Sequence, residues 1–148
     1  DATKTKETCR AINGRQYVVP GDWARVLDAE GHIELLGRGS AVVNTGGEKV
    51  YPAEVEQAIL EHPAVADAVV IGTPDERFGE AVTAIVVPQE GVTIDRAELA
   101  AHLDRRLAGY KKPKHVLLRD SLQRSPHGKL DLRKLRQEAE QELAEVAR

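Results

Sequence analysis

The sequence predicts an α+β protein with a small mixed sheet, helices packed on that sheet, and β-hairpins before it. Short β-type runs separated by turn residues fill residues 17–36, and apolar β-branched runs alternate with helix-type segments after residue 50. The apolar fraction of 41% and the charged fraction of 30% are those of a globular chain. At 148 residues, the chain fits one ordinary domain, or a small domain with part of another.

The N-terminal part is predicted to contain strands and turns. Residues 1–15 carry no sustained apolar period, and only a short helix over residues 4–10 is weakly encoded. The turn at residues 28–31 suits a hairpin, because Gly31 can adopt a positive φ. Residues 37–40 interrupt the β pattern and mark the predicted boundary between two parts. The strands expected before this boundary are residues 17–19, 23–27 and 32–36.

The elements after residue 40 follow from apolar spacing and turn residues. Asn44-Thr45-Gly46-Gly47 is a tight turn between β runs at 41–43 and 48–50. A helix should begin at Pro52 and end before Pro63, since proline fits the first helical turn but not the interior. The remaining expected elements are strands at 64–71, 81–87 and 115–118, a helix from the cap Asp95 to Gly109, and a charged amphipathic helix at 130–147.

Composition argues against several classes of function. A net charge of −3 gives no electrostatic case for binding nucleic acid, and no apolar run approaches the roughly 20 residues of a transmembrane helix. Cys9 is the only cysteine, so no intramolecular disulfide can form, and we expect a reducing, cytoplasmic location. The sequence has no methionine, even at position 1, and we expect it to be a piece of a longer protein.

Common nucleotide and metal motifs do not fit. The glycines at 37, 39, 46 and 47 do not form a dinucleotide fingerprint, because a hairpin follows them instead of a helix. Gly128-Lys129 is not a phosphate-binding Walker loop, since the earlier glycine and the following Ser or Thr are missing. The five histidines lie far apart without ligand spacing, so we expect no metal held by protein groups.

Three polar loops remain, and each has an ordinary explanation when taken alone. Asp22 follows Pro20-Gly21 and can cap its own turn. Arg38 precedes a long polar segment at residues 44–56, Asn-Thr-Gly-Gly-Glu-Lys-Val-Tyr-Pro-Ala-Glu-Val-Glu. Lys129 lies in the third loop, Arg-Ser-Pro-His-Gly-Lys-Leu, and a lysine after Pro-x-Gly is usually a solvated turn residue.

Together, in this order and with these spacings, the loops resemble the adenylate-forming superfamily of acyl-CoA synthetases, luciferase-like enzymes and adenylation domains of peptide synthetases. The resemblance runs from about residue 17 to residue 135 and is closest at residues 46–56. It implies that residues 1–36 are the tail of a large N-terminal domain, residues 37–40 a hinge, and residues 41–148 a mobile C-terminal domain. Ser40 stands where the superfamily usually has Asp or Lys, although Gly39 still permits rotation of the backbone.

The resemblance implies a ligase that first joins a carboxylic acid to ATP and then, after rotation of the small domain, transfers the acyl group to a thiol. Asp22 matches an aspartate that binds the ribose hydroxyls, and Arg38 matches an arginine near the nucleotide. Lys129 matches the catalytic lysine, whose long ammonium arm follows charge over the reacting carboxylate and α-phosphate. The expected co-substrates are CoA and ATP, with Mg²⁺ bound through the ATP phosphates.

The same resemblance assigns the thiol step to other residues. Gly46, Gly47 and Glu48 would line the tunnel for the pantetheine arm, where glycines leave room for the thiol. Three lysines after Tyr110 are candidate contacts for the CoA phosphates, and the alternative for them is a solvated basic turn. These lysines are Lys111, Lys112 and Lys114.

The expected function is therefore that of the C-terminal domain of an ATP-dependent acyl-CoA ligase. Its partner is the missing N-terminal domain, and its substrate class is a fatty acid or a steroid-side-chain acid. This chain alone is expected to be inactive. Two alternatives are an adenylation domain that loads a carrier protein and a non-catalytic interaction module. The absence of a phosphopantetheine-attachment sequence after the last helix favours free CoA.

Overall fold

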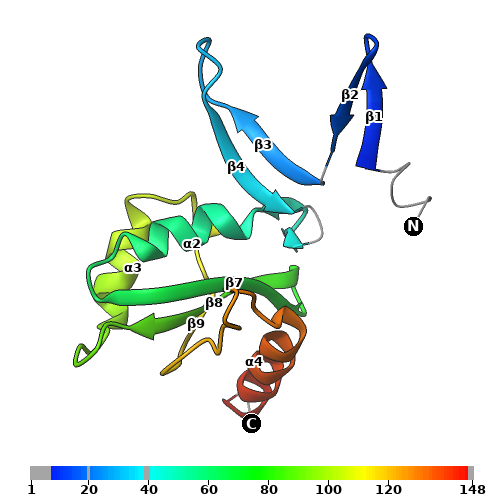
Figure 1. Ribbon diagram of the computed structural model, residues 1–148. Coiled ribbons are helices and arrows are strands. Elements are labelled where there is room, and N and C mark those ends of the chain that lie inside the picture. The colour runs from blue at the N-terminus through cyan, green and yellow to red at the C-terminus, as the bar shows by residue number, and fades with distance from the viewer. Residues whose placement is uncertain (1–7, 20, 39–40, 147–148) are drawn as a thin grey trace. The chain divides into compact units, whose positions relative to one another are not determined.

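The computed structural model describes residues 8–19, 21–38 and 41–146, which fall into two compact units divided between residues 40 and 41. The described N-terminal unit consists of two antiparallel hairpins (Figure 1). The first pairs β1 (Cys9–Ile12) with β2 (Arg15–Val18), and the second pairs β3 (Asp22–Val26) with β4 (Ile33–Arg38). Gly31 has a φ of 87° in the turn of the second hairpin, as its sequence predicts.

The first hairpin corrects the prediction for the start of the chain. Cys9 and Arg10 lie in a strand, whereas the weak apolar pattern predicts a helix over residues 4–10. Residues 1–7 lie outside the described residues. Asn13 and Gly14 have φ values of 50° and 75°, the positive-φ pair that a two-residue Asn-Gly hairpin turn requires. Pairing across this turn therefore determines the structure of the segment, and periodicity along it does not.

A five-stranded mixed sheet forms the centre of the C-terminal unit. Its strand order is β6-β5-β8-β7, and β9 pairs in parallel with β8. The long hairpin of β7 and β8 pairs along nearly its whole length, whereas within the described residues β5 has a single ladder pair with β8, Thr45 with Gly79. The sheet confirms the predicted small mixed sheet. Its strands are β5 (Val43–Thr45), β6 (Glu48–Val50), β7 (Val65–Asp75), β8 (Gly79–Pro88) and β9 (His115–Leu118).

Helices cover both faces of this sheet, as Figure 1 shows for α2 (Pro52–Leu60), α3 (Arg96–Asp104) and α4 (Leu132–Val146). Successive side chains of a strand face opposite sides, so β7 and β8 supply two cores. One core includes Val70 and Val86 and is covered by α2 and α3. The other includes Ile71 and Ile85 and is covered by α4. Burial on both faces explains the almost continuous apolar runs of these strands.

Prolines and caps determine the helix boundaries. α2 begins at Pro52 and ends before Pro63, as the sequence predicts. Asp95 caps α3 by accepting hydrogen bonds from the N–H groups of Ala97 and Glu98. However, α3 ends at Asp104, before the predicted end at Gly109. Gly109 instead begins the short 3-10 helix η2 (Gly109–Lys111).

The start of α4 depends on a cap that the sequence prediction overlooks. Asp131 accepts a hydrogen bond from the N–H of Lys134 at 3.1 Å, so the helix begins at Leu132 and not at Leu130. α4 then packs Leu135 and Ala139 against the sheet. Among the described residues, no helix combines the length and hydrophobicity that a membrane crossing requires.

Candidate functional site

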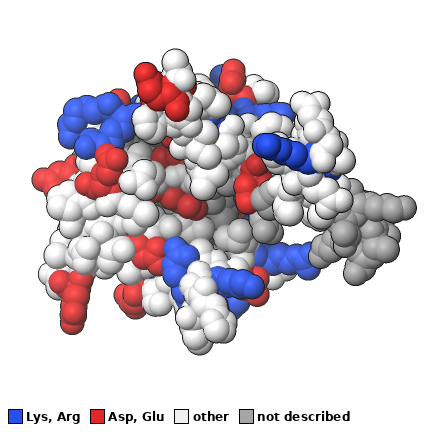
Figure 2. Space-filling view, turned by 45° about the horizontal axis from the view of Figure 1, so that its top comes forward, with Lys and Arg blue, Asp and Glu red and all other residues white. Residues whose placement is uncertain are grey.

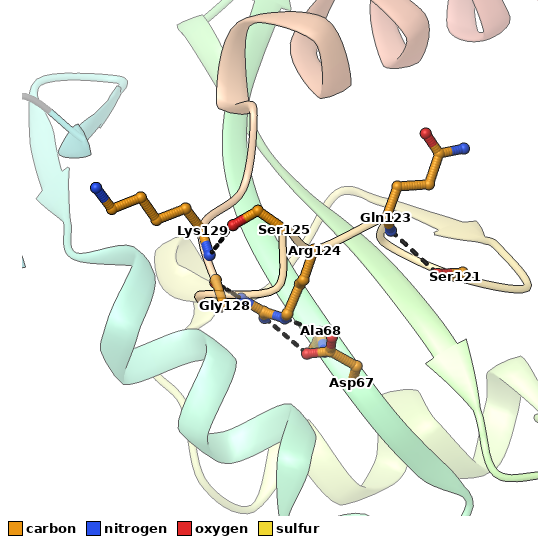
Figure 3. Close-up of polar contacts among 8 residues, drawn as sticks. All are labelled: Asp67, Ala68, Ser121, Gln123, Arg124, Ser125, Gly128 and Lys129. Carbon is orange, nitrogen blue, oxygen red and sulfur yellow. Dashed lines mark hydrogen bonds and ion pairs between the residues drawn. The ribbon is translucent and has the colours of Figure 1, made fainter.

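Lys129 lies on a closed turn between β9 and α4 (Figure 3). The Ser125 N–H donates to the Lys129 carbonyl oxygen at 2.9 Å, and the Lys129 N–H donates to Ser125 Oγ at 3.0 Å. Gly128 allows the turn to close with a φ of 75°, and its N–H donates to the Ser125 carbonyl oxygen at 2.8 Å. The Lys129 side chain is exposed, and Figure 3 shows it extending away from the other labelled side chains. The backbone is thus fixed, while the ammonium has no hydrogen-bond partner among the described residues.

Arg124 fastens this turn to strand β7. Its Nε and Nη2 atoms both donate to the Asp67 carboxylate at 2.7 Å, and Nη1 donates to the Gly128 carbonyl oxygen at 3.3 Å. The Asp67 carboxylate also accepts the N–H of Ala68 at 2.9 Å. The hydrogen bonds from Arg124 lower the pKa of Asp67, and the same pair raises the pKa of Arg124. A two-point ion pair of this kind fixes orientation as well as distance.

Glu56 lies in the segment that resembles the superfamily, but the sequence does not predict the contact that it makes. It lies on α2 and accepts the N–H of Val70, on the outer edge of β7, at 2.9 Å. Burial raises the pKa of Glu56, although the Val70 N–H and the charge of Arg124 act in the opposite direction. Glu56 therefore joins α2 to the strand that also holds the Lys129 turn.

The hairpin of β5 and β6 needs glycine at position 46 for two reasons. Gly46 has a φ of 58°, and a Cβ there would lie 3.0 Å from Cδ1 of Phe78. Its N–H donates to the Phe78 carbonyl oxygen at 2.9 Å. Gly47 has a φ of 89° and open space around it. The two central positions of the turn therefore carry no side chain, and the thiol passage along them stays a prediction.

This hairpin meets the basic segment at a pocket of about 450 Å³. Two groups of predicted residues, far apart in the sequence, thus contribute to one cavity. Phe78, 39% exposed, and Tyr110, 45% exposed, offer aromatic surface there. The lining includes Thr45, Gly46, Glu48, Phe78, Tyr110, Lys112, Pro113 and Lys114.

All three candidate lysines make internal ion pairs. The Lys111 side chain is only 16% exposed, so it mainly ties η2 to α2. Lys112 and Lys114 are 37% and 51% exposed, and both line the pocket. A phosphate contact therefore stays a prediction that fits Lys112 and Lys114 better than Lys111. The ion pairs are Lys111–Glu54 at 2.6 Å, Lys112–Asp104 at 2.6 Å and Lys114–Asp75 at 2.5 Å.

Asp75 shapes the turn that presents Phe78 to the pocket. Its carboxylate accepts the N–H groups of Arg77 and Phe78 at 3.0 and 2.9 Å, in addition to Lys114 Nζ. The hydrogen bond from Lys114, followed by that from the Phe78 N–H, lowers the pKa of Asp75 to about 2. The Phe78 ring is accompanied by two cations, with Arg77 Cζ at 5.0 Å and Lys114 Nζ at 5.9 Å from its centroid.

The predicted nucleotide contacts lie in the N-terminal unit. Asp22 and Arg38 are direct partners in the ladder of β3 and β4, at the end of the hairpin where β3 begins and β4 ends. The structure therefore brings together two residues that the sequence places in separate loops. The predicted hinge residue Ser40 lies outside the described residues.

The electrostatic character of the surface is mixed. Figure 2 shows Lys and Arg interspersed with Asp and Glu on the face it presents, without one dominant sign. Within residues 8–19, 21–38 and 41–146, no group of three or more His, Cys, Asp or Glu side chains is arranged to hold a metal ion.

Comparison with known protein families matches residues 54–129 to the AMP-binding enzyme C-terminal domain. The matched segment ends at Lys129 and includes Glu56, Asp67 and Glu80.

Two curated relatives are ligases of longer chain length. The chain is 52% identical over 133 residues to a medium/long-chain-fatty-acid–CoA/3-oxocholest-4-en-26-oate–CoA ligase of Mycolicibacterium smegmatis, covering 90% of this chain and 24% of the relative. It is also 52% identical over 133 residues to a 3-oxocholest-4-en-26-oate–CoA ligase of Rhodococcus rhodochrous, with the same coverage. The chain spans about a quarter of the length of these relatives.

A solved structure has the same fold. The apo crystal structure of MatB from Rhodopseudomonas palustris superposes with a TM-score of 0.77 and is 40% identical in sequence. The superposition covers 94% of this chain and 27% of that one. The α+β fold predicted from the sequence is therefore confirmed by comparison as well as by the described elements.

Proposed function

The chain belongs to the family of AMP-binding enzyme C-terminal domains, and on that premise we propose that it is the mobile domain of an ATP-dependent acyl-CoA ligase. A carboxylate oxygen of the acid attacks the α-phosphate of ATP, which forms an acyl-adenylate and releases pyrophosphate. The CoA thiol then attacks the acyl carbon, loses its proton, and displaces AMP. The observation that carries the proposal is Lys129, an exposed ammonium on a backbone turn that is closed and anchored.

Lys129 serves the first half-reaction. Its ammonium carries a full charge on a flexible arm, so it can pair with both the substrate carboxylate and the α-phosphate as negative charge moves between them. The closed turn at Gly128 fixes where the arm begins, and the side chain retains its reach. Such an interaction is strongest when domain closure excludes water from the reacting atoms.

The pocket beside the glycine hairpin serves the second half-reaction. Gly46 and Gly47 leave space for a narrow pantetheine arm, because neither carries a side chain. Phe78 and Tyr110 provide flat surfaces on which the adenine of CoA can stack. Lys112 and Lys114 bring positive charge to the same lining, where it can meet the CoA phosphates.

We propose that the C-terminal domain rotates between the two half-reactions. The division of the chain between residues 40 and 41 supports a hinge near Ser40. The first two residues of the predicted hinge 37–40, Gly37 and Arg38, are instead paired with β3 at the end of β4, so the β pattern continues two residues further than the sequence predicts. Asp22 and Arg38 would remain with the nucleotide on the large N-terminal domain. ATP would bring Mg²⁺ on its phosphates, and we propose a cytoplasmic location, where ATP and CoA are both available.

The names of the relatives support the substrate class. Both are CoA ligases, which favours CoA over a carrier protein, and their acids are fatty acids or 3-oxocholest-4-en-26-oate. We propose that the acid used with this domain is likewise a fatty acid or a steroid-side-chain acid.

Replacing the catalytic lysine tests the proposed function. In a ligase that carries this domain, Lys129→Ala should abolish pyrophosphate release but largely retain thioester formation from supplied acyl-adenylate. Arg133→Ala is the matched control, since it removes an exposed cation from the start of α4. Equal losses in both half-reactions would count against the role of Lys129.

A further inference from the structure

Few hydrogen bonds join the hairpin of β5 and β6 to strand β8 of the sheet. Thr45 and Gly79 form its only ladder pair with β8 in the described residues, and Gly46 bonds the Phe78 carbonyl oxygen. Beyond this pair the ladder stops, and a side chain replaces it. The Asn44 N–H donates to Glu80 Oε2 at 2.9 Å. The Glu80 carboxylate therefore supplies the acceptor that a neighbouring strand would otherwise offer to the segment that leads into the turn.

The other oxygen of Glu80 accepts a hydrogen bond from α4 and lies close to the backbone of β7. Arg136 of α4 donates to Glu80 Oε1 at 3.3 Å, and Glu140 accepts from the same guanidinium at 2.8 Å. A Cβ on Gly72 of β7 would lie 2.9 Å from Glu80 Oε1 and 3.0 Å from its Cδ. Gly72 has an ordinary φ, so the close approach of the carboxylate is what makes a side chain unfavourable at this position.

The Lys129 turn depends on a different carboxylate at the opposite end of β7. Asp67 lies near the beginning of this strand, whereas Glu80 lies opposite Pro74, near its end. Asp67 binds Arg124 and the Ala68 N–H, and Glu80 binds Arg136 and the Asn44 N–H. The two carboxylates share none of these partners.

We propose that two separate carboxylates, Asp67 and Glu80, position the loops of the two half-reactions. Asp67 acts through Arg124 on the Lys129 turn, and Glu80 acts through the Asn44 amide on the Gly46-Gly47 hairpin. Both are positioning residues, since neither is placed against the reacting atoms. The inference rests on the proposed function. A displacement of about 1 Å can reduce a rate about 100-fold, so loosening either loop should slow the step that it serves.

The first test removes the charge of Asp67. Asp67→Asn keeps an oxygen for the Ala68 N–H but weakens the two-point ion pair with Arg124. We expect pyrophosphate release in the complete ligase to fall about 10-fold or more, and thioester formation from supplied acyl-adenylate to change less than about twofold. Arg124→Lys should slow the same step, because lysine keeps the charge but loses the two-point geometry on Asp67.

The second test displaces Glu80 in two independent ways. Glu80→Ala removes the carboxylate, whereas Gly72→Ala leaves it in the chain and pushes it away from its position. The clash in Gly72→Ala is with the end of a flexible side chain, so the domain should still fold. Both variants should slow thioester formation about 10-fold or more while adenylation continues.

Amide hydrogen exchange on the 148-residue chain gives a readout that does not require activity. Glu80→Ala and Gly72→Ala should speed exchange of the Asn44 N–H and leave the Lys129 N–H protected. Asp67→Asn should do the opposite. Glu90→Gln is the control, because Glu90 is exposed and has no hydrogen-bond partner among the described residues.

The outcomes separate this inference from the function on which it rests. If the variants leave both amides unchanged, or lower both half-reactions in equal proportion, the positioning roles are wrong. If Lys129→Ala also fails to separate the half-reactions, the proposed function itself is wrong. If Lys129→Ala separates them while Asp67→Asn and Glu80→Ala do not, only the present inference is overturned.

Discussion

Asp75 illustrates how one side chain can organise the edge of a site. Three donors converge on its carboxylate, and the bond from Lys114 contributes most to lowering its pKa from 3.8 to about 2. Because the pKa is lower in the folded protein, ionised Asp75 stabilises the fold at pH values above 3.8. This contribution should be lost as the pH falls from 3.8 towards 2. An NMR titration of the Asp75 carboxyl should therefore have its midpoint near 2, and Asp75→Asn should remove this part of the acid dependence of stability. A midpoint near 3.8 would contradict the ion pair with Lys114.

The residues of the candidate site differ in how far the sequence can predict them. Lys129 and Gly46 stand in short segments whose order and spacing carry the family resemblance. Asp67 and Glu80 carry no such signal, because their partners Arg124 and Arg136 are brought to them only by folding. A charged side chain in a strand predicts solvent exposure in general, and nothing in the local sequence predicts which cation it will meet.

The elements were predictable where a local feature decides them. Pro52 and Pro63 bound α2, and Asp95 caps α3. The end of α3 is different. Leu107 continues the apolar spacing and is buried, yet it lies beyond the helix, so the spacing predicted its burial and not its backbone conformation. The first hairpin was not predictable from periodicity, because it depends on pairing across Asn13-Gly14.

The cap of α3 gives a prediction at the scale of this element. The Asp95 carboxylate accepts the Ala97 N–H at 2.7 Å and the Glu98 N–H at 3.4 Å, and these amides have no partner within the helix. Asp95→Ala should therefore reduce the free energy of unfolding by about 1 kcal/mol. Urea denaturation of the chain measures this loss. Asp95→Asn is the control and should retain most of the stability, since its amide oxygen can still accept. Equal losses in the two variants would show that the charge, and not the cap, is what matters.

At the scale of the whole molecule, the two units differ in how they bury apolar side chains. Both hydrophobic clusters in the described residues are built from side chains of the C-terminal unit, from Val43 to Leu143. The described hairpins of the N-terminal unit instead expose large apolar side chains, including Trp23 at 56% and Leu35 at 66%. The predicted boundary at residues 37–40 is adjacent to the division between these units. Its use as a hinge stays a prediction.

This difference predicts that residues 41–148 fold as an independent domain. Since the apolar clusters come from this unit alone, removing residues 1–40 should change its free energy of unfolding by no more than about 0.5 kcal/mol. Denaturation of the 148-residue chain and of residues 41–148, followed by far-UV circular dichroism, measures the change. A non-cooperative transition for residues 41–148 would contradict the prediction, because a domain with its own core unfolds as one unit.

The same unit should have no ligase activity by itself. In the proposed function, Lys129 acts on a carboxylate and an α-phosphate that another surface must hold, and the chain spans only about a quarter of the length of its curated relatives. A mixture of a fatty acid, ATP and CoA should therefore yield no acyl-CoA with either the 148-residue chain or residues 41–148. A ligase that carries the same domain serves as the positive control, and acyl-CoA is measured by chromatography. Turnover by the chain alone would show that it holds its own substrates, and the requirement for an N-terminal domain would then be wrong.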